Sequence, residues 1–159
     1  AGGLRGIKRR LYEGGIRAAM AVRWPGRVPA GRTSDFVWGM RDVFPTACDI
    51  AGIEPPDGLD GMSVLSVLLG GQQKAREHMY WEFYSPFQQA VRMGGWKGIR
   101  FGTEEPVELY DLETDRGEQN DIAARHPQIV AGMQHIMNRS HTDSRYWPAV
   151  KKRSGRRRR

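Results

Sequence analysis

Short runs in the second half of the chain alternate hydrophobic with polar residues, the pattern of β-strands. The strands predicted from these aromatic-rich runs are 79–84, 89–93, 96–101 and 107–111. Gly94 and Gly95 separate two of them by the two-residue spacing of a tight hairpin. A helix is predicted at 127–138, because apolar residues recur there on one face and Pro127 suits a first turn. These elements predict a four-stranded antiparallel sheet with a helix.

The first half of the chain has a different pattern. Residues 14–24 are small or apolar on both faces and end at a Pro-Gly turn, which predicts a buried strand of a covered sheet. Helical spacing predicts a helix at 43–51, with Asp42 as its N-cap and Gly52 as its C-terminal stop. A second, short helix is predicted at 63–69.

The change of pattern near residue 72 predicts a division of the chain. Residues 1–72 are expected to form the C-terminal end of a larger α/β domain, and residues 73–148 a small α+β domain. A strand in residues 1–72 would lack sheet neighbours, so we expect that part to be poorly stable alone. Residues 149–159 are predicted to be a disordered basic tail.

Charge and composition narrow the classes of partner. The formal net charge is +7, but seven basic residues lie in 151–159, and without them basic and acidic residues are equal in number. The folded part is therefore not expected to bind nucleic acid specifically. No apolar run approaches the roughly 18 residues of a membrane span. Cys48, the only cysteine, is expected to be a buried small hydrophobe and cannot form an intrachain disulfide.

The segment from Leu4 to Arg17 reads Leu-Arg-Gly-Ile-Lys-Arg-Arg-Leu-Tyr-Glu-Gly-Gly-Ile-Arg. It resembles a sulfatase family pattern: Leu-Arg, a Lys three residues later, then Tyr-Glu-Gly-Gly-x-Arg. Further stretches agree with the family in order, and the resemblance covers about residues 4–148. They are 24–26, 42–46, 51–53, 57–63, 91–92, 96–97, 108–112 and 115–121. The resemblance implies the C-terminal part of an alkaline-phosphatase-like α/β fold, followed by a smaller antiparallel-sheet domain.

The resemblance also implies a chemistry for the intact enzyme. Members hydrolyse sulfate esters with a formylglycine, made from a Cys or Ser in a Cys/Ser-x-Pro-x-Arg motif, and a divalent cation, usually calcium. Cys48 is followed by Asp49-Ile50-Ala51 and does not match that motif. The family's Asp-Asn metal pair precedes the Lys loop, and no metal ligand is predicted in this chain. The chain alone is therefore expected to be inactive.

Only Lys8 matches an active-site position of the family, which implies a catalytic and sulfate-binding role. A lysine ammonium is a compact charge with three donors, suited to the charge that develops on a departing sulfate. Trp96 and Lys97, on a predicted strand, are further candidates for substrate contact, with core packing as the alternative for Trp96. Glu13 and Arg17, four residues apart, are expected to be structural.

The expected partner is a sulfated small molecule or a sulfated carbohydrate. Two alternatives stay open at this point. A phosphodiesterase or phosphonate hydrolase shares the scaffold and could share the Lys loop. A non-enzymatic module could instead bind polyanions through residues 151–159. The four histidines show no metal-ligand spacing and are expected to be structural.

Overall fold

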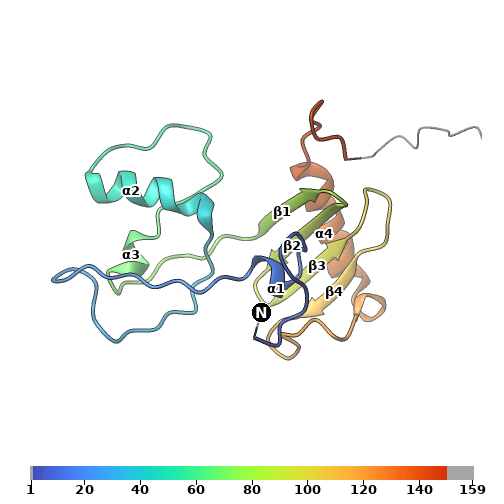
Figure 1. Ribbon diagram of the computed structural model, residues 1–159, viewed down its shortest axis with the longest axis horizontal. Helices are drawn as coiled ribbons and strands as arrows, with labels where there is room; N and C mark the ends of the chain where they lie inside the picture. Colours follow the sequence, from blue (N-terminus) through green and yellow to red (C-terminus); the bar gives the residue numbers. More distant parts are fainter. Residues whose placement is uncertain (1, 150–159) are drawn as a thin grey trace, which may run out of the picture. The chain divides into compact units, whose positions relative to one another are not determined.

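The computed structural model describes residues 2–149, and the sheet within them has the strand order β1-β2-β3-β4 (Figure 1). The strands are β1 Met79–Tyr84, β2 Phe87–Met93, β3 Trp96–Arg100 and β4 Glu108–Asp111. All neighbours are antiparallel, and Gly94 and Gly95 form the hairpin that sets Met93 opposite Trp96. The four predicted strands are confirmed, each end within two residues.

Both faces of this sheet are covered, by segments from opposite ends of the chain (Figure 1). Helix α4 (Pro127–Ser140) packs on one face, where Met133 and Met137 contact Val91 and Leu109. All four of these residues are fully buried. This helix was predicted at 127–138. A short 3-10 helix, η2 (Ala123–Arg125), precedes it.

The opposite face is covered by the N-terminal segment, residues 4–17, which includes α1 (Glu13–Ile16). Its Leu11 and Tyr12 pack against Ala90, Ile99 and Tyr110. Successive residues of a strand point to opposite faces, so β2 and β3 each supply one set of side chains to α4 and the other to this segment. The sheet is thus the middle of three layers.

The predicted strand at 14–24 is not formed. Residues 13–16 make the single turn of α1, and residues 17–24 have no regular structure. A central strand needs hydrogen-bonding neighbours on both sides, and the part of the chain described here offers it none. Met20 is accordingly 60% exposed.

The chain separates into two compact units that differ from the predicted 1–72 and 73–148. One unit joins the residues up to Ala18 with those from Glu77 onward, and the other is Ala19–Arg76. The difference arises because the N-terminal segment is a layer of the small sheet domain. The predicted tail, 149–159, lies outside the described residues except for Ala149.

The unit Ala19–Arg76 contains η1 (Met40–Asp42), α2 (Val43–Ala51) and α3 (Leu65–Leu68), which correspond to the two predicted helices. Gly52 ends α2 with φ +68, as expected. Asp42 occupies the predicted N-cap position of α2, but its side chain makes no capping hydrogen bond there. Its buried carboxylate instead accepts hydrogen bonds from Gly39 N at 2.8 Å and Met62 N at 3.0 Å, and pairs with Arg76.

Amide hydrogen exchange tests the three-layer arrangement. The amides of Glu13 and Gly14 donate to Glu118 and Arg5, whereas residues 19–23 make no backbone–backbone hydrogen bond within the described chain. We expect Glu13 and Gly14 to exchange at least about 100-fold more slowly than residues 19–23. Equal protection of the two stretches would show that residues 19–23 are in a strand and that the assigned layers are wrong.

Candidate functional site

Lys8 lies in a tight turn, in which Arg10 N donates to Ile7 O at 3.0 Å. The Lys8 side chain is exposed, and it forms no hydrogen bond or ion pair with any residue in the range 2–149. The next residue, Arg9, has φ +76, a left-handed conformation that is uncommon for a residue with a side chain. The turn therefore presents a free ammonium from a backbone that the surrounding structure must hold in place.

A buried side chain of β2 holds this turn. The Gln88 side chain, fully enclosed, donates from Nε2 to Arg9 O at 3.1 Å and accepts from Leu11 N at 3.4 Å. One amide group thus fixes the backbone on both sides of Arg10. The position of Lys8 is set by the sheet as well as by the turn itself.

Two glycines let the turn lie against α1. A Cβ added to Gly14 would lie 2.5 Å from the carbonyl oxygens of Arg5 and Gly6, and one on Gly15 would overlap Arg10 O. Contacts under 3.0 Å are not tolerated by backbone atoms, so both positions require glycine. Gly14 and Gly15 are therefore needed for the Lys8 turn to pack against α1, and they do not begin a strand.

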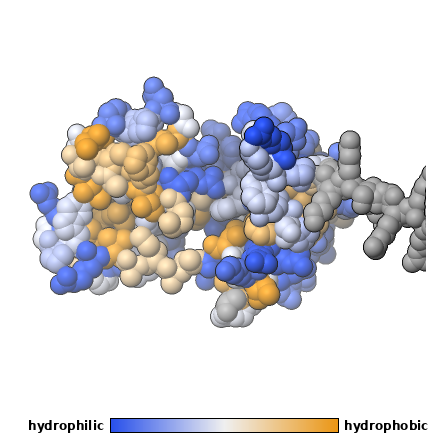
Figure 2. Space-filling model, turned by 45° about the horizontal axis from the view of Figure 1, so that its top comes forward, coloured by the Kyte–Doolittle hydropathy of each residue, from blue (hydrophilic) through white to orange (hydrophobic). Residues whose placement is uncertain are grey.

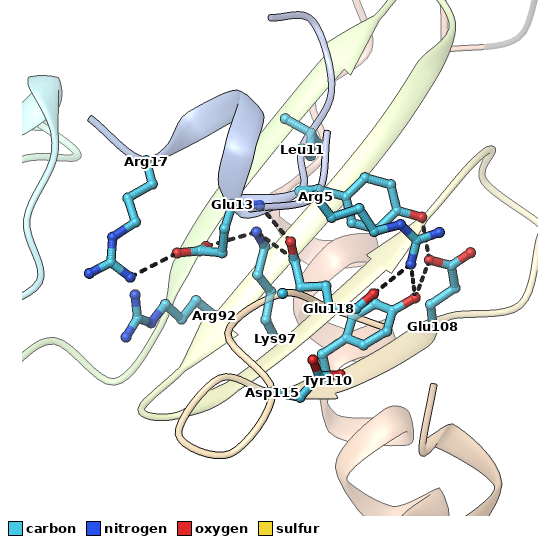
Figure 3. Close-up of polar contacts among 12 residues, drawn as sticks. Arg5, Leu11, Glu13, Arg17, Arg92, Lys97, Glu108, Tyr110, Asp115 and Glu118 are labelled. Carbon is cyan, nitrogen blue, oxygen red and sulfur yellow. Dashed lines mark hydrogen bonds and ion pairs between the residues drawn. The ribbon is translucent and has the colours of Figure 1, made fainter. Parts of the chain in front are cut away.

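A buried charge cluster joins the N-terminal segment to the sheet (Figure 3). Lys97 Nζ, from β3, lies 2.9 Å from Glu13 Oε1 and 2.9 Å from Glu118 Oε1. The Lys97 side chain is 0% exposed. The contact with Glu118 Oε1 is an ion pair only, because that oxygen accepts no hydrogen bond from residues 2–149. Arg17 Nη1, 3.5 Å from Glu13 Oε2, adds the fourth charge.

Glu118 binds the N-terminal segment in two further ways. Its Oε2 accepts from Glu13 N at 2.7 Å, and its main-chain oxygen accepts from Arg5 Nη1 at 2.7 Å. Burial raises the pKa of Glu118, although Lys97 and the Glu13 amide oppose this by favouring the ionised form. Glu118 also has φ +54, so its backbone is held in a conformation that few non-glycine residues adopt.

A ring of polar and aromatic groups closes the other end of the segment. Glu108 Oε2 accepts from Tyr12 Oη at 2.6 Å and from Tyr110 Oη at 2.8 Å. Burial is the larger cause that raises the pKa of both tyrosines, and the hydrogen bond to the Glu108 carboxylate raises it further. Both hydroxyls therefore stay protonated and act as donors. The Arg5 guanidinium lies 4.0 Å above the Tyr12 ring and donates to Tyr110 Oη at 2.9 Å.

The structure separates the three residues that the sequence proposed for substrate contact. Lys8 is exposed at its turn. Lys97 is sealed in the core against two carboxylates, and this leaves its ammonium inaccessible to a ligand. Trp96 projects to the opposite face, half-buried against the α4 layer, with its ring 4.9 Å from that of His126. Lys8 is exposed and Trp96 is half-buried, and the role of each in substrate contact stays a prediction.

Three features of this region were not predicted from the sequence. Gln88, Glu118 and Glu108 carry the contacts that hold the Lys8 segment. Only Glu118 and Glu108 fell within stretches similar to the family, and no pattern singled out Gln88. The predicted contact between Glu13 and Arg17 is present, although the strand it was expected to anchor is absent.

Residues 2–149 contain neither a metal-ligand cluster nor a helix that could span a membrane. No group of three or more His, Cys, Asp or Glu side chains there is arranged to hold a metal ion. None of the helices in that range has the length and apolar character to cross a bilayer.

Comparison with known proteins assigns the chain to a family of enzymes. The family model described as N-sulphoglucosamine sulphohydrolase, C-terminal, matches residues 6–143. N-acetylgalactosamine-6-sulfatase of Canis lupus familiaris is 37% identical over 92 residues, which are 57% of this chain and 17% of that protein. Steryl-sulfatase of Mus musculus is 33% identical over 165 residues, covering 81% of this chain and 26% of that protein. The chain thus spans about a quarter or less of these relatives.

Solved structures agree with this assignment. One from a study of glycosaminoglycan metabolism by Bacteroides thetaiotaomicron superposes with a TM-score of 0.76 at 26% identity, over 87% of this chain and 32% of its own. Another is a complex with its substrate, D-glucosamine-2-N,6-O-disulfate, with a TM-score of 0.63 at 25% identity. The superposition includes 74% of this chain and 26% of the chain in that complex.

The charge cluster predicts that substitution of Lys97 greatly lowers the stability of the fold. Lys97→Met leaves two buried carboxylates without their shared cation, which should lower the free energy of unfolding by about 3–5 kcal/mol. Adding Glu118→Gln removes one of those charges, so the double variant should recover much of the loss. Urea denaturation at pH 7 measures both.

The pH dependence and a surface control sharpen that test. In Lys97→Met the penalty comes from ionised carboxylates, so it should shrink as the pH falls and Glu118, whose pKa is already raised, binds a proton. Lys74→Met, at an exposed site, should change stability by less than about 0.5 kcal/mol. Equal effects of Lys97→Met and Lys74→Met would contradict the cluster.

Proposed function

This chain belongs to the N-sulphoglucosamine sulphohydrolase C-terminal family, and we propose that in an intact sulfatase it supplies Lys8 to bind and polarise the sulfate ester. The observation that carries the proposal is the free, exposed ammonium of Lys8 on a turn fixed by Gln88 and by the two glycines. Hydrolysis of a sulfate ester is the activity this supports.

The chemistry needs a fixed cation. Negative charge grows on the departing oxygen as the ester bond breaks, and a preorganised ammonium stabilises it without reorganising in the transition state. Lys8 meets this need because its backbone is held from the sheet, while its side chain has no carboxylate partner in the described chain. Lys97, by contrast, has its charge neutralised by Glu13 and Glu118.

The substrate class is proposed to be a sulfated carbohydrate. Support comes from the relatives, since one acts on N-acetylgalactosamine 6-sulfate by its name and one structure holds a disulfated glucosamine. The likeness to a steryl-sulfatase keeps a sulfated small molecule as the second candidate. Both curated relatives are named as sulfatases, which favours sulfate over phosphate or phosphonate esters as the target.

The rest of the catalytic apparatus is assigned to other segments of the intact enzyme. The family uses a metal, and no group of three or more His, Cys, Asp or Glu side chains in residues 2–149 is arranged to hold one. Large apolar side chains gather on the unit of α2 and α3 (Figure 2), where Met40 is 86% and Phe44 54% exposed. Such a surface is typical of one that packs against further protein.

Substitution of Lys8 in the intact enzyme tests the proposal. Lys8→Ala should lower kcat by about 10²–10³-fold, the usual cost of losing one preorganised group that stabilises charge. Lys8→Arg should restore only part of the rate, because a planar guanidinium does not occupy the same point. Steady-state hydrolysis of a chromogenic aryl sulfate measures kcat and KM separately.

Arg10→Ala provides the matched control. Arg10 is a cation of the same turn, two residues away and also exposed, and its side chain forms no hydrogen bond or ion pair with residues 2–149. Its loss should change kcat by less than about threefold, since a solvated surface charge contributes little. If Lys8→Ala and Arg10→Ala had the same small effect, Lys8 would be a surface residue and the proposal would be lost.

A further inference from the structure

The segment that follows α4, residues 141–147, is joined to the edge strand β1 through a histidine. His141 Nδ1 lies 2.9 Å from Glu82 Oε2 of β1, and its Nε2 lies 3.1 Å from Asp143 Oδ1. The ring packs edge-on against Phe87 of β2, with the ring centroids 5.5 Å apart. The imidazole is therefore fixed between two carboxylates, one from the sheet and one from the segment itself.

The two ring nitrogens show which form of His141 fits this geometry. A neutral imidazole donates a hydrogen bond from one nitrogen, and its other nitrogen is an acceptor. An ionised carboxylate also accepts only, so a neutral ring would turn a lone pair toward one of its two partners. The doubly protonated imidazolium can donate to Glu82 and to Asp143 at the same time. The contact is therefore complete only when the ring is charged.

The titratable groups around His141 come from three places. Tyr80 and Glu82 lie on β1, Asp143 lies in the segment, and Arg100, Glu104 and Glu105 line the cavity that His141 also lines. Only Glu82 and Asp143 pair with the ring among residues 2–149. The hydrogen bond to Glu82 is the largest influence and raises the pKa of His141 above the ordinary 6.5; burial opposes it, and Asp143 raises it further. The two carboxylates thus outweigh burial.

Few other contacts hold this segment to the sheet. Within the described chain, the hydrogen bonds of residues 142–147 stay inside 141–147, as in those from the amides of Tyr146 and Trp147 to Ser144. The Trp147 ring lies over that of Tyr84, with centroids 4.1 Å apart, but the two residues are 54% and 43% exposed. The contact of His141 with Glu82 is thus the polar link between the segment and β1.

We propose that His141 is a pH-sensitive clasp, which fastens residues 141–147 to β1 when it is protonated and releases them when it loses its proton. The direction follows from the raised pKa of the folded protein. The attachment is fully present below the ordinary histidine pKa of 6.5 and is lost as the pH rises through the higher pKa of folded His141. The clasp involves neither Lys8 nor its turn, so it does not rest on the proposed function.

NMR of the 159-residue chain between about pH 5 and pH 9 tests the clasp. The ring-carbon shifts of His141 give its pKa, which should lie above 6.5. Backbone ¹⁵N relaxation of Tyr146 and Trp147 should give order parameters of about 0.8 in acid and below about 0.6 at high pH, with the same midpoint as the ring. Order parameters that do not change with pH, or a pKa of 6.5 or lower, would overturn the proposal.

Substitution of His141 shows whether this group causes the transition. His141→Gln keeps a neutral side chain that can form hydrogen bonds but cannot take up a proton, so the order of Tyr146 and Trp147 should no longer depend on pH. His135→Gln, at an exposed histidine of α4, is the matched control and should leave the transition in place. A transition that persists in His141→Gln would show that another group is responsible.

The two carboxylates provide variants that keep the test valid if a change at His141 disturbs the end of α4. Asp143 is 98% exposed at its side chain, so Asp143→Asn should leave the fold intact, and it should lower both the pKa of His141 and the midpoint of the transition. Glu82→Gln should lower both by more, because Glu82 is the less exposed partner and the larger influence. Midpoints that stay unchanged in both variants would contradict the clasp.

Discussion

The ion pairs of Lys97 with Glu13 and Glu118 are the interaction on which the rest of this structure depends. Each charge taken out of water costs several kcal/mol, and the cost is offset only if the partners meet in good geometry. A shift of residue 13 along the sheet would leave a buried carboxylate without its cation. The cluster thereby fixes where the N-terminal segment lies on β3, more strictly than its few apolar contacts would.

The ion pairs of Lys97 also determine the position of the Lys8 turn. Glu13 is held at Lys97, and Gly14 and Gly15 leave room for the chain to double back over α1. Gln88 then secures the turn from β2. The candidate site is therefore a surface group on a buried support, in which the polar residues of the core have a positional role and the exposed one has the chemical role.

The sheet could be predicted because hydrophobic and polar residues alternate along a strand whose two faces lie in different environments. The same reasoning failed at residues 14–24, where small residues were needed for close approach to carbonyl oxygens and not for burial between strands. Lys8 was identified by resemblance alone, since its neighbours Arg9 and Arg10 have the same local pattern. Gln88 and Glu118 act on backbone groups 79 and 105 residues away, which no local pattern can show.

The two lysines that the sequence offered as candidates give the most direct test of this account. A crystal structure of the intact enzyme with sulfate bound would show which ammonium meets the anion. The account predicts Lys8 Nζ within about 3 Å of a sulfate oxygen, the distance of a charge-assisted hydrogen bond, while Lys97 remains between Glu13 and Glu118. Sulfate bound to Lys97 with its carboxylates displaced, or Lys8 directed into solvent, would contradict it.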